Sequence, residues 1–222
     1  MERKISVSLM CADLLNLESE IKLLEKSGVD YLHMDITDGH LVPNLTFGPD
    51  FVTAMHRVSN TPTDTHLMVK DPALILSKLK IRKGDILSVH VELDCNFAAM
   101  SKTVRDAGGK FGLAINPETP IEALEPWLAI TDVVILMLVR PGFAGGKLID
   151  GILDKVPQTR AYLDARGHAN TLISVDGSVS TERARLMAGM GANIFVGGTT
   201  AVYRPGQPLE QSMREFRAAI SE

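Results

Sequence analysis

The sequence predicts an α/β protein, a single TIM-type (β/α)₈ barrel domain that takes in residues 1–222. Eight short apolar runs alternate with amphipathic segments along the chain, and no linker, low-complexity tract or charge block interrupts the rhythm. Eight successive strand–helix units favour a closed barrel over an open sheet. With 222 residues, of which 45% are hydrophobic, the chain can bury a full core without staples. An open, doubly wound sheet is the alternative, because repetition alone does not establish closure.

The predicted strands are short apolar runs bounded by polar residues or glycine, a pattern typical of buried parallel strands. In chain order they are Lys4–Met10, Asp30–Ile36, Thr63–Val69, Asp85–Glu92, Lys110–Asn116, Asp132–Val139, Thr171–Asp176 and Asn193–Thr199. The segments between them have apolar residues at helical spacing and tend to start near Pro, Asn, Asp or Ser and to stop near Gly. The predicted helices are Leu14–Leu24, Val52–Val58, Pro72–Lys80, Phe97–Ala107, Ile121–Ala129, Ile149–Arg166, Thr181–Gly189 and Leu209–Ile220.

Composition excludes several classes of partner and location. The net charge is −4 with acids and bases interspersed, so the chain has no basic footprint for nucleic acid and no polybasic patch for a membrane. No apolar run reaches membrane-spanning length, and no N-terminal stretch has a signal-peptide layout. Cys11 and Cys95 are isolated and form no secretory disulfide framework. We therefore expect a cytoplasmic protein that binds a small molecule.

Polar residues gather where the predicted strands end, which is where barrel enzymes place their chemistry. His33 and Asp35 lie two apart on one strand and so point to the same side. Taken alone, this pair is equally well explained as a core histidine beside a turn-capping aspartate. His66 and Asp176 end two other strands, however, and buried charge is costly unless it is paired or binds metal. The distribution favours a functional site.

Together, His33, Asp35, His66 and Asp176 offer two imidazoles and two carboxylates, a set that suits zinc, iron or manganese. The absence of a thiolate argues against a structural zinc site. His90 fits three roles: a partner behind a metal ligand, a substrate contact, or a packed neutral core residue. The remaining histidines fall on predicted loops or helices, where we expect them to be solvated: His40, His56 and His168.

Glycine-rich segments follow three successive predicted strands. They are Pro141–Gly146, Asp176–Ser178 and Gly197–Thr200. Glycine lets backbone N–H groups approach an anion closely, and loops after the seventh and eighth strands recur as phosphate sites in this fold. These segments predict a phosphate site. Met10, Met68 and Met137 also sit near strand ends, either as core filling or as an apolar wall around a reactive intermediate.

Motifs along nearly the whole chain resemble the ribulose-phosphate 3-epimerase family. The matching segments are Ser8–Met10, His33–His40, Val42–Asn44, Thr46–Pro49, His66–Val69, His90–Glu92, Asn116–Pro120, Pro141–Gly145, Val175–Gly177 and Gly198–Thr199. The resemblance implies a ribulose-phosphate-binding barrel with one divalent metal ion per subunit, zinc being expected first, then iron or manganese. It also implies an isomerase that interconverts ketose phosphates epimeric at C3, ribulose 5-phosphate and xylulose 5-phosphate being the usual pair.

The resemblance assigns roles to matching positions. The implied metal ligands are His33, Asp35, His66 and Asp176, with Asp35 and Asp176 also acting as the two acid/base groups. The implied substrate contacts are Ser8, His66, Gly142, Gly145, Gly177, Gly198 and Thr199. Inverting a carbon next to a carbonyl requires a proton to leave one face and another to reach the opposite face. Two opposed carboxylates can do this while a metal stabilises the enediolate.

Departures from the family pattern lie around the rim, at Thr37, Leu138, Arg140, Gly146 and Ser178. Thr37 stands where the family usually has Met. Arg140 either binds a second anionic group or points outward. Several local details resemble the allulose-6-phosphate 3-epimerase branch, which is one alternative, and a non-catalytic phosphosugar-binding relative is another. A phosphosugar aldolase or decarboxylase is disfavoured because no predicted strand end carries a suitable lysine. The resemblance also implies a homo-oligomer.

Overall fold

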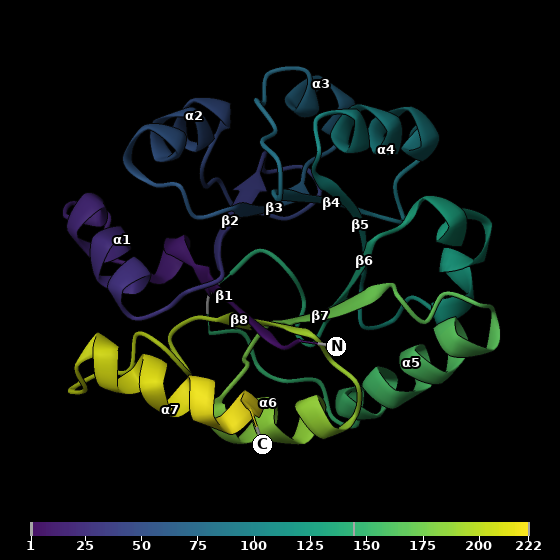
Figure 1. Cartoon of the computed structure of the whole chain (residues 1–222). Helices are drawn as coiled ribbons and strands as arrows, with labels where there is room; N and C mark the ends of the chain where they lie inside the picture. Colours follow the sequence, from purple (N-terminus) through teal and green to yellow (C-terminus); the bar gives the residue numbers. More distant parts are fainter. Residues whose placement is uncertain (1, 144, 222) are drawn as a thin grey trace.

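A computed structural model describes residues 2–143 and 145–221, so Ala144 of the predicted loop Pro141–Gly146 lies outside the described residues, as do Met1 and Glu222. Eight parallel strands form a closed barrel in sequence order (Figure 1). The strands are β1 (Lys4–Ser8), β2 (Tyr31–Thr37), β3 (Thr63–Met68), β4 (Ile86–His90), β5 (Lys110–Ile115), β6 (Val133–Met137), β7 (Leu172–Asp176) and β8 (Ile194–Gly197). Pairing of β1 with β8, with Ile5 opposite Phe195, closes the ring. The predicted barrel is confirmed, and the open sheet is wrong.

Helices surround the strands on the outside of the barrel (Figure 1). They are α1 (Leu17–Lys26), α2 (Pro49–Val58), α3 (Pro72–Leu76), α4 (Phe97–Asp106), α5 (Lys155–Ala165), α6 (Thr181–Gly189) and α7 (Leu209–Ser221). Three 3₁₀ segments complete the set in the described part of the chain: η1 (Leu9–Cys11), η2 (Ile121–Ile130) and η3 (Ile152–Asp154). The side chains of Asp71, Asn96 and Ser180 each accept a backbone N–H in the first turn of the helix that follows, as N-caps do.

Several predicted boundaries differ from the observed ones. The predicted helix Ile121–Ala129 is a 3₁₀ segment that contains Pro126, which has no N–H to donate and clashes with the preceding turn of an α-helix. The predicted helix Pro72–Lys80 ends at Leu76, and Ile149–Arg166 divides into η3 and α5. At the site end of the barrel, β1 stops at Ser8 and turns into η1 before it reaches Met10.

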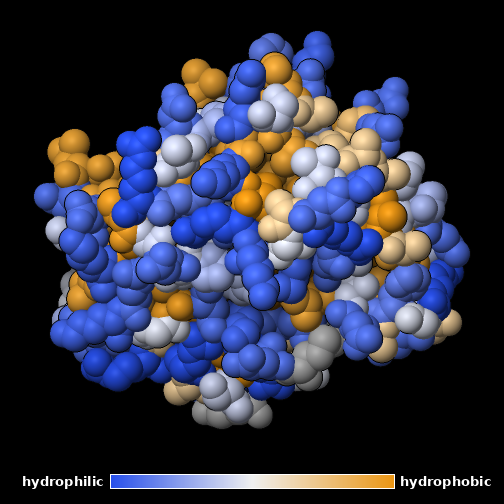
Figure 2. All heavy atoms as spheres, turned by 45° about the horizontal axis from the view of Figure 1, so that its top comes forward, coloured by the Kyte–Doolittle hydropathy of each residue, from blue (hydrophilic) through white to orange (hydrophobic). Residues whose placement is uncertain are grey.

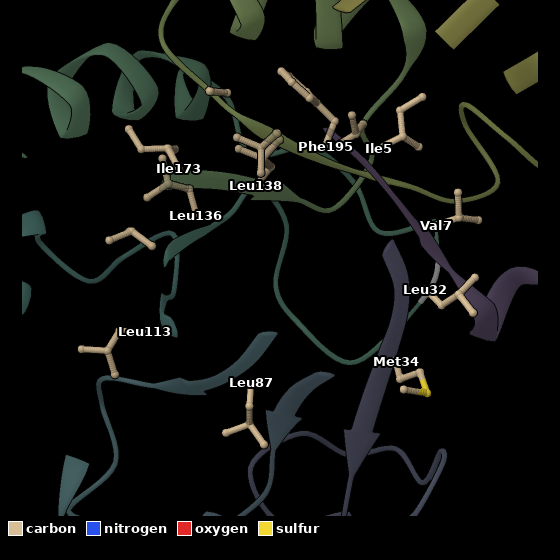
Figure 3. Close-up of a cluster of buried hydrophobic side chains, with 14 of the residues drawn as sticks. Ile5, Val7, Leu32, Met34, Leu87, Leu113, Leu136, Leu138, Ile173 and Phe195 are labelled. Carbon is tan, nitrogen blue, oxygen red and sulfur yellow. The ribbon is translucent and has the colours of Figure 1, made fainter. Parts of the chain in front are cut away.

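The main core lies between the barrel and the surrounding helices. Alternate strand residues point outward, and Figure 3 shows them as a ring of apolar side chains around the strands: Ile5, Val7, Leu32, Met34, Leu87, Leu113, Leu136, Leu138, Ile173 and Phe195. A smaller apolar cluster belongs to the other set of alternating positions and includes Tyr31, Ile86 and Ile135. The helices thus pack on one apolar layer, and the barrel interior is free to carry other chemistry.

The barrel interior is unusually polar. Ser6, His33, Asp64, Ser88 and Ser174 are all at most 1% exposed, and they occupy the inward-facing strand positions. Outside, hydrophilic side chains cover most of the face seen in Figure 2, with smaller hydrophobic areas between them. Within residues 2–143 and 145–221, no helix has both the length and the apolar character needed to cross a membrane.

Candidate metal centre and substrate cleft

Four side chains from three strands meet at one end of the barrel. His33 and Asp35 come from β2, His66 comes from β3, and Asp176 ends β7. Each contributes one ligand-type atom, and these four atoms all lie within 4.8 Å of one another. Nε2 of His33 is 3.2 Å from Oδ1 of Asp35 and 3.7 Å from Oδ2 of Asp176. The residues predicted from strand ends are therefore brought together.

Asp64 fixes the orientation of His33 from the side of the ring that faces away from the cluster. Nδ1 of His33 lies 2.8 Å from Oδ2 of Asp64, which also accepts a hydrogen bond from the hydroxyl of Ser6 at 2.8 Å. An ionised carboxylate only accepts, so Nδ1 of His33 carries the proton and Nε2 faces the cluster. A carboxylate behind an imidazole in this way is typical of metal-ligating histidines.

His66 is held in the opposite sense. Its Nδ1 faces the cluster, 3.4 Å from Oδ1 of Asp35, and its Nε2 lies 3.0 Å from Nε2 of His90. Nδ1 of His90 lies 3.1 Å from Oε2 of Glu92. His90 is fully buried and does not line the cleft, so of its three possible roles the structure supports that of a partner behind His66.

The electrostatics of the cluster favour a cation. Burial opposes protonation of His33, but the carboxylates of Asp35 and Asp64 outweigh it and raise the pKa of His33 well above 6.5. Burial likewise opposes protonation of His66, whose pKa is raised by Asp176 and Asp35. Burial raises the pKa of Asp35, but the two imidazoles lower it far below 3.8. The carboxylates therefore make the electrostatic potential in the cluster negative, and this favours the binding of a positive ion.

The donor set fits a divalent ion. Two imidazole nitrogens and two carboxylate oxygens match the ligand chemistry of zinc, iron or manganese. Nδ1 of His66 is buried, 3.4 Å from Oδ1 of Asp35, and makes no hydrogen bond of good geometry to the described residues, so a bound ion would supply the partner that this atom needs. The residues present can therefore hold the predicted ion.

A cleft of about 580 Å³, counting its open mouth, lies above the cluster. Its lining includes both carboxylates and six of the seven predicted substrate contacts: Asp35, Asp176, Ser8, Gly142, Gly145, Gly177, Gly198 and Thr199. The seventh, His66, is fully buried beneath the cleft floor with His33. This volume suits a small ligand, and the carboxylates are the acidic groups that such a ligand would meet first.

Close packing requires glycine at the cleft wall. Gly177 has φ +101°, and a Cβ there would lie 2.5 Å from Cγ2 and 3.1 Å from the backbone nitrogen of Val139. Gly142 has φ +111°, and its Cβ would lie 2.8 Å from Cβ of Val42. A side chain at Gly177 would push the loops after β6 and β7 apart, and one at Gly142 would push apart the loops after β6 and β2, so either would change the cleft.

Comparison with known proteins identifies the family of this chain. The sequence profile described as the ribulose-phosphate 3 epimerase family matches residues 4–203. The chain belongs to the ribulose-phosphate 3-epimerase family. It is 40% identical to "Ribulose-phosphate 3-epimerase" of Bacillus subtilis over 200 residues, which cover 90% of this chain and 92% of that protein. It is also 40% identical to the protein of the same name from Rhodobacter capsulatus, over 91% of this chain and 87% of that one.

Solved structures agree on the fold. KGPDC from Streptococcus mutans superposes with a TM-score of 0.71 at 15% identity, over 100% of this chain and 98% of that one. A 3-hexulose-6-phosphate synthase superposes with a TM-score of 0.63 at 18% identity, over 98% and 99%. At these identities the likeness concerns the barrel alone. Membership of the epimerase family confirms the predicted class, a carbohydrate-phosphate epimerase among the isomerases.

Positions that depart from the family pattern have definite surroundings in this family member. The Thr37 hydroxyl lies 3.1 Å from the hydroxyl of Thr46, so it ties down the loop after β2 and does not line the cleft. The Arg140 side chain is 81% exposed and pairs with Glu118, so it points outward. Ser178 lines the cleft with φ +51°. The predicted methionines Met10, Met68 and Met137 also line it.

One expectation about the histidines is wrong. His56 lies on α2 but its side chain is only 9% exposed, 3.6 Å from the buried carboxylate of Asp85. Its helix packs on the barrel, and the helical pattern did not show which face this residue would take. His40 is exposed and His168 is half-buried.

Asp64 and Glu92 were missed as parts of the site. Both lie two residues from a site histidine, in the pairs Asp64/His66 and His90/Glu92, and so share its side of the strand or strand end. This is the spacing that singled out His33 and Asp35. Applied to all three histidine-bearing strands, the same rule would have found both carboxylates.

Proposed function

We propose that this family member interconverts ribulose 5-phosphate and xylulose 5-phosphate with one divalent cation held by His33, Asp35, His66 and Asp176. The observation that carries the proposal is the pair of carboxylates at the floor of a glycine-walled cleft, each with one oxygen in the four-atom cluster. Zinc is the first metal to test, because two imidazoles and two carboxylates are good zinc ligands, and iron and manganese are the others.

The two aspartates are the proposed acid and base. Asp35 faces the imidazoles through Oδ1, and Asp176 faces them through Oδ2. This leaves Oδ2 of Asp35 and Oδ1 of Asp176 outside the cluster. The Oδ2 atom of Asp35 is 3.4 Å from the hydroxyl of Ser8, which can steady it. One carboxylate takes the proton from C3 and the other returns a proton to the opposite face, so the configuration inverts.

A bound cation would stabilise developing negative charge, and the two buried histidines are oriented in advance to hold that cation. When bound, a divalent cation supplies Lewis-acid stabilisation to negative charge that develops on the carbonyl and hydroxyl oxygens of the substrate. His33 and His66 are positioned by Asp64 and His90, so their ring nitrogens are already oriented before substrate arrives. Met10, Met68 and Met137 line the cleft with apolar surface and limit the access of water to the reacting carbon.

The phosphate is proposed to lie against the loops after β6, β7 and β8. Gly142, Gly145, Gly177, Gly198 and Thr199 line this side of the cleft. Backbone N–H groups at such glycines can approach phosphate oxygens. Behind them, the guanidinium of Arg183 donates to the hydroxyl and the carbonyl of Ser178, which brings a positive charge to this wall.

Solvent deuterium exchange tests the proposal. The protein is incubated with ribulose 5-phosphate in heavy water, with zinc, iron(II) or manganese supplied in turn. Xylulose 5-phosphate with deuterium at C3 is the expected product. A parallel assay with allulose 6-phosphate separates the two branches of the family. Absence of exchange with both sugars and all three metals would overturn the proposal, and binding without exchange would favour a phosphosugar sensor.

Asp176→Asn isolates the acid/base role. Loss of one proton-transfer group lowers kcat by roughly 10²–10⁴-fold. Metal content must be measured in the same sample, because Asp176 is also a proposed ligand. Asp50→Asn, an exposed carboxylate at the start of α2, makes the same chemical change away from the cleft and should leave kcat unchanged.

A further inference from the structure

A chain of three side chains runs from the metal centre to the loop after β5. Nε2 of His66 meets Nε2 of His90 at 3.0 Å, and Nδ1 of His90 meets Oε2 of Glu92 at 3.1 Å. Both histidines are fully buried, and the Glu92 side chain is 26% exposed. Because one end of the chain is a carboxylate, the direction of both hydrogen bonds can be worked out from that end.

Glu92 is anchored as an ionised acceptor. Its Oε1 accepts the backbone N–H of Asn116 at 2.8 Å and the hydroxyl of Thr119. The ammonium of Lys155 donates to the backbone carbonyls of Asn116, Pro117 and Thr119, which fixes the loop that holds Glu92. Burial raises the pKa of Glu92, but the hydrogen bonds from its neighbours lower it to about 2. At neutral pH both of its oxygens can only accept.

The direction of each hydrogen bond follows from the ionised carboxylate of Glu92. Since Oε2 of Glu92 accepts, Nδ1 of His90 must carry a proton. Two facing ring nitrogens 3.0 Å apart share one proton. A neutral imidazole carries a single proton, so His90 protonated on Nδ1 presents a lone pair at Nε2. That lone pair requires a proton on Nε2 of His66. A neutral His66 protonated on Nε2 then presents the Nδ1 lone pair to the cluster.

We propose that Glu92 is a positioning residue that, through His90, fixes His66 in the tautomer that offers Nδ1 to the metal. The inference rests on the proposed function in one respect, that the cluster holds a cation. Asp64 contacts His33 directly, at 2.8 Å, and fixes it in the tautomer that offers Nε2 to the metal. The two imidazoles are thus set by two carboxylates on different strands or strand ends, one acting directly and one through a second imidazole.

Glu92→Gln is the sharpest test, because it is isosteric. The amide oxygen can keep the hydrogen bonds from Asn116 and Thr119, which places the NH₂ group against Nδ1 of His90. His90 must then accept at Nδ1 and carry its proton on Nε2, which faces the proton on Nε2 of His66. Relief of that conflict puts a proton on Nδ1 of His66 and removes the lone pair from the cluster.

Two measurements report the effect separately. In ¹⁵N-edited NMR of the imidazole rings, His90 should change from the Nδ1–H to the Nε2–H tautomer in the variant. In calorimetric titration with zinc, the variant should bind roughly 10–100-fold more weakly than wild type, as is typical when an outer partner of a ligand is lost. Glu118→Gln is the matched control, because Glu118 lies on the loop after β5 that contacts Glu92, is exposed and pairs with Arg140. It should change neither readout.

Each outcome decides the inference. Wild-type His90 with its proton on Nε2 would overturn it, and this test stands even if the variant fails to fold. A variant that reverses the His90 tautomer and still binds zinc within about twofold of wild type, well short of the expected 10–100-fold loss, would also overturn it. If the wild-type protein binds no zinc, iron or manganese, the proposed function fails. The His90 tautomer still reports whether Glu92 fixes the proton positions on His90 and His66.

Discussion

Gly177→Ala should destabilise the protein through a clash that the structure locates. Gly177 follows Asp176 directly, has φ +101°, and a Cβ there would lie 2.5 Å from Cγ2 and 3.1 Å from the backbone nitrogen of Val139. The backbone conformation costs an L-residue about 1–2 kcal/mol. Overpacking against a neighbour whose backbone cannot retreat adds about 1–3 kcal/mol. The free energy of unfolding should therefore fall by roughly 2–5 kcal/mol, the sum of those two ranges.

Differential scanning calorimetry measures the effect. For a protein of this size, each kcal/mol corresponds to roughly 2–4 °C in Tm, so a loss of roughly 4–20 °C is expected. Gly167→Ala is the control, since Gly167 has φ +79° but no described atom within 4 Å of its added Cβ. It should show the backbone cost alone, about 1–2 kcal/mol. Equal Tm values for the two variants would refute the argument that Val139 and Gly177 are in forced contact.

Three further predictions concern residues around the site. Asp64→Asn should weaken zinc binding roughly 10–100-fold in calorimetric titration, because it removes the carboxylate that orients a ligand imidazole. Arg140→Ala should leave KM for the sugar phosphate unchanged in steady-state assays, because the side chain is 81% exposed and points outward. Burial raises the pKa of Glu92, but hydrogen bonds from His90 and Thr119 lower it to about 2 from 4.5. Its ionised form thus stabilises the folded state fully above pH about 4.5, and urea unfolding of wild type and Glu92→Gln should converge as pH falls from there toward 2.

The barrel is predictable from sequence because its signal is repeated. Each apolar run is short and each intervening segment has helical spacing, so one ambiguous unit does not change the interpretation. Segment Ile121–Ala129 shows the limit. Its apolar pattern is helical, but Pro126 cannot supply the N–H that an α-helix needs, and the segment forms a 3₁₀ helix.

The gathering of the four ligand-type residues was predictable for a topological reason. In a parallel barrel the carboxyl ends of all strands meet at one face, so His33, His66 and Asp176 had to come near one another once the strands were correct. The contacts behind the ligands were predicted only in part: His90 as a partner behind a ligand was one of three roles left open, and Asp64 and Glu92 were given no role. Spacing places His90 and Glu92 on one side of their strand end, but it does not encode the side-chain rotamers that join them to His66.

Surface and helix positions were the least predictable. The sequence leaves Arg140 with two possible orientations, and its ion pair with Glu118 on a neighbouring loop selects the outward one. His56 was expected to be solvated, but it faces the barrel beside Asp85. In both cases the deciding contact comes from a segment distant in sequence, and a local pattern carries no information about it.

Anomalous diffraction from zinc-soaked crystals shows whether the four-residue cluster holds an ion, because it locates the metal without assuming any activity. We expect one zinc peak per chain at the end of the barrel, within about 2.0–2.2 Å of His33 Nε2, His66 Nδ1 and an oxygen each of Asp35 and Asp176. A chain without zinc at this position, or with zinc bound only elsewhere, would contradict it.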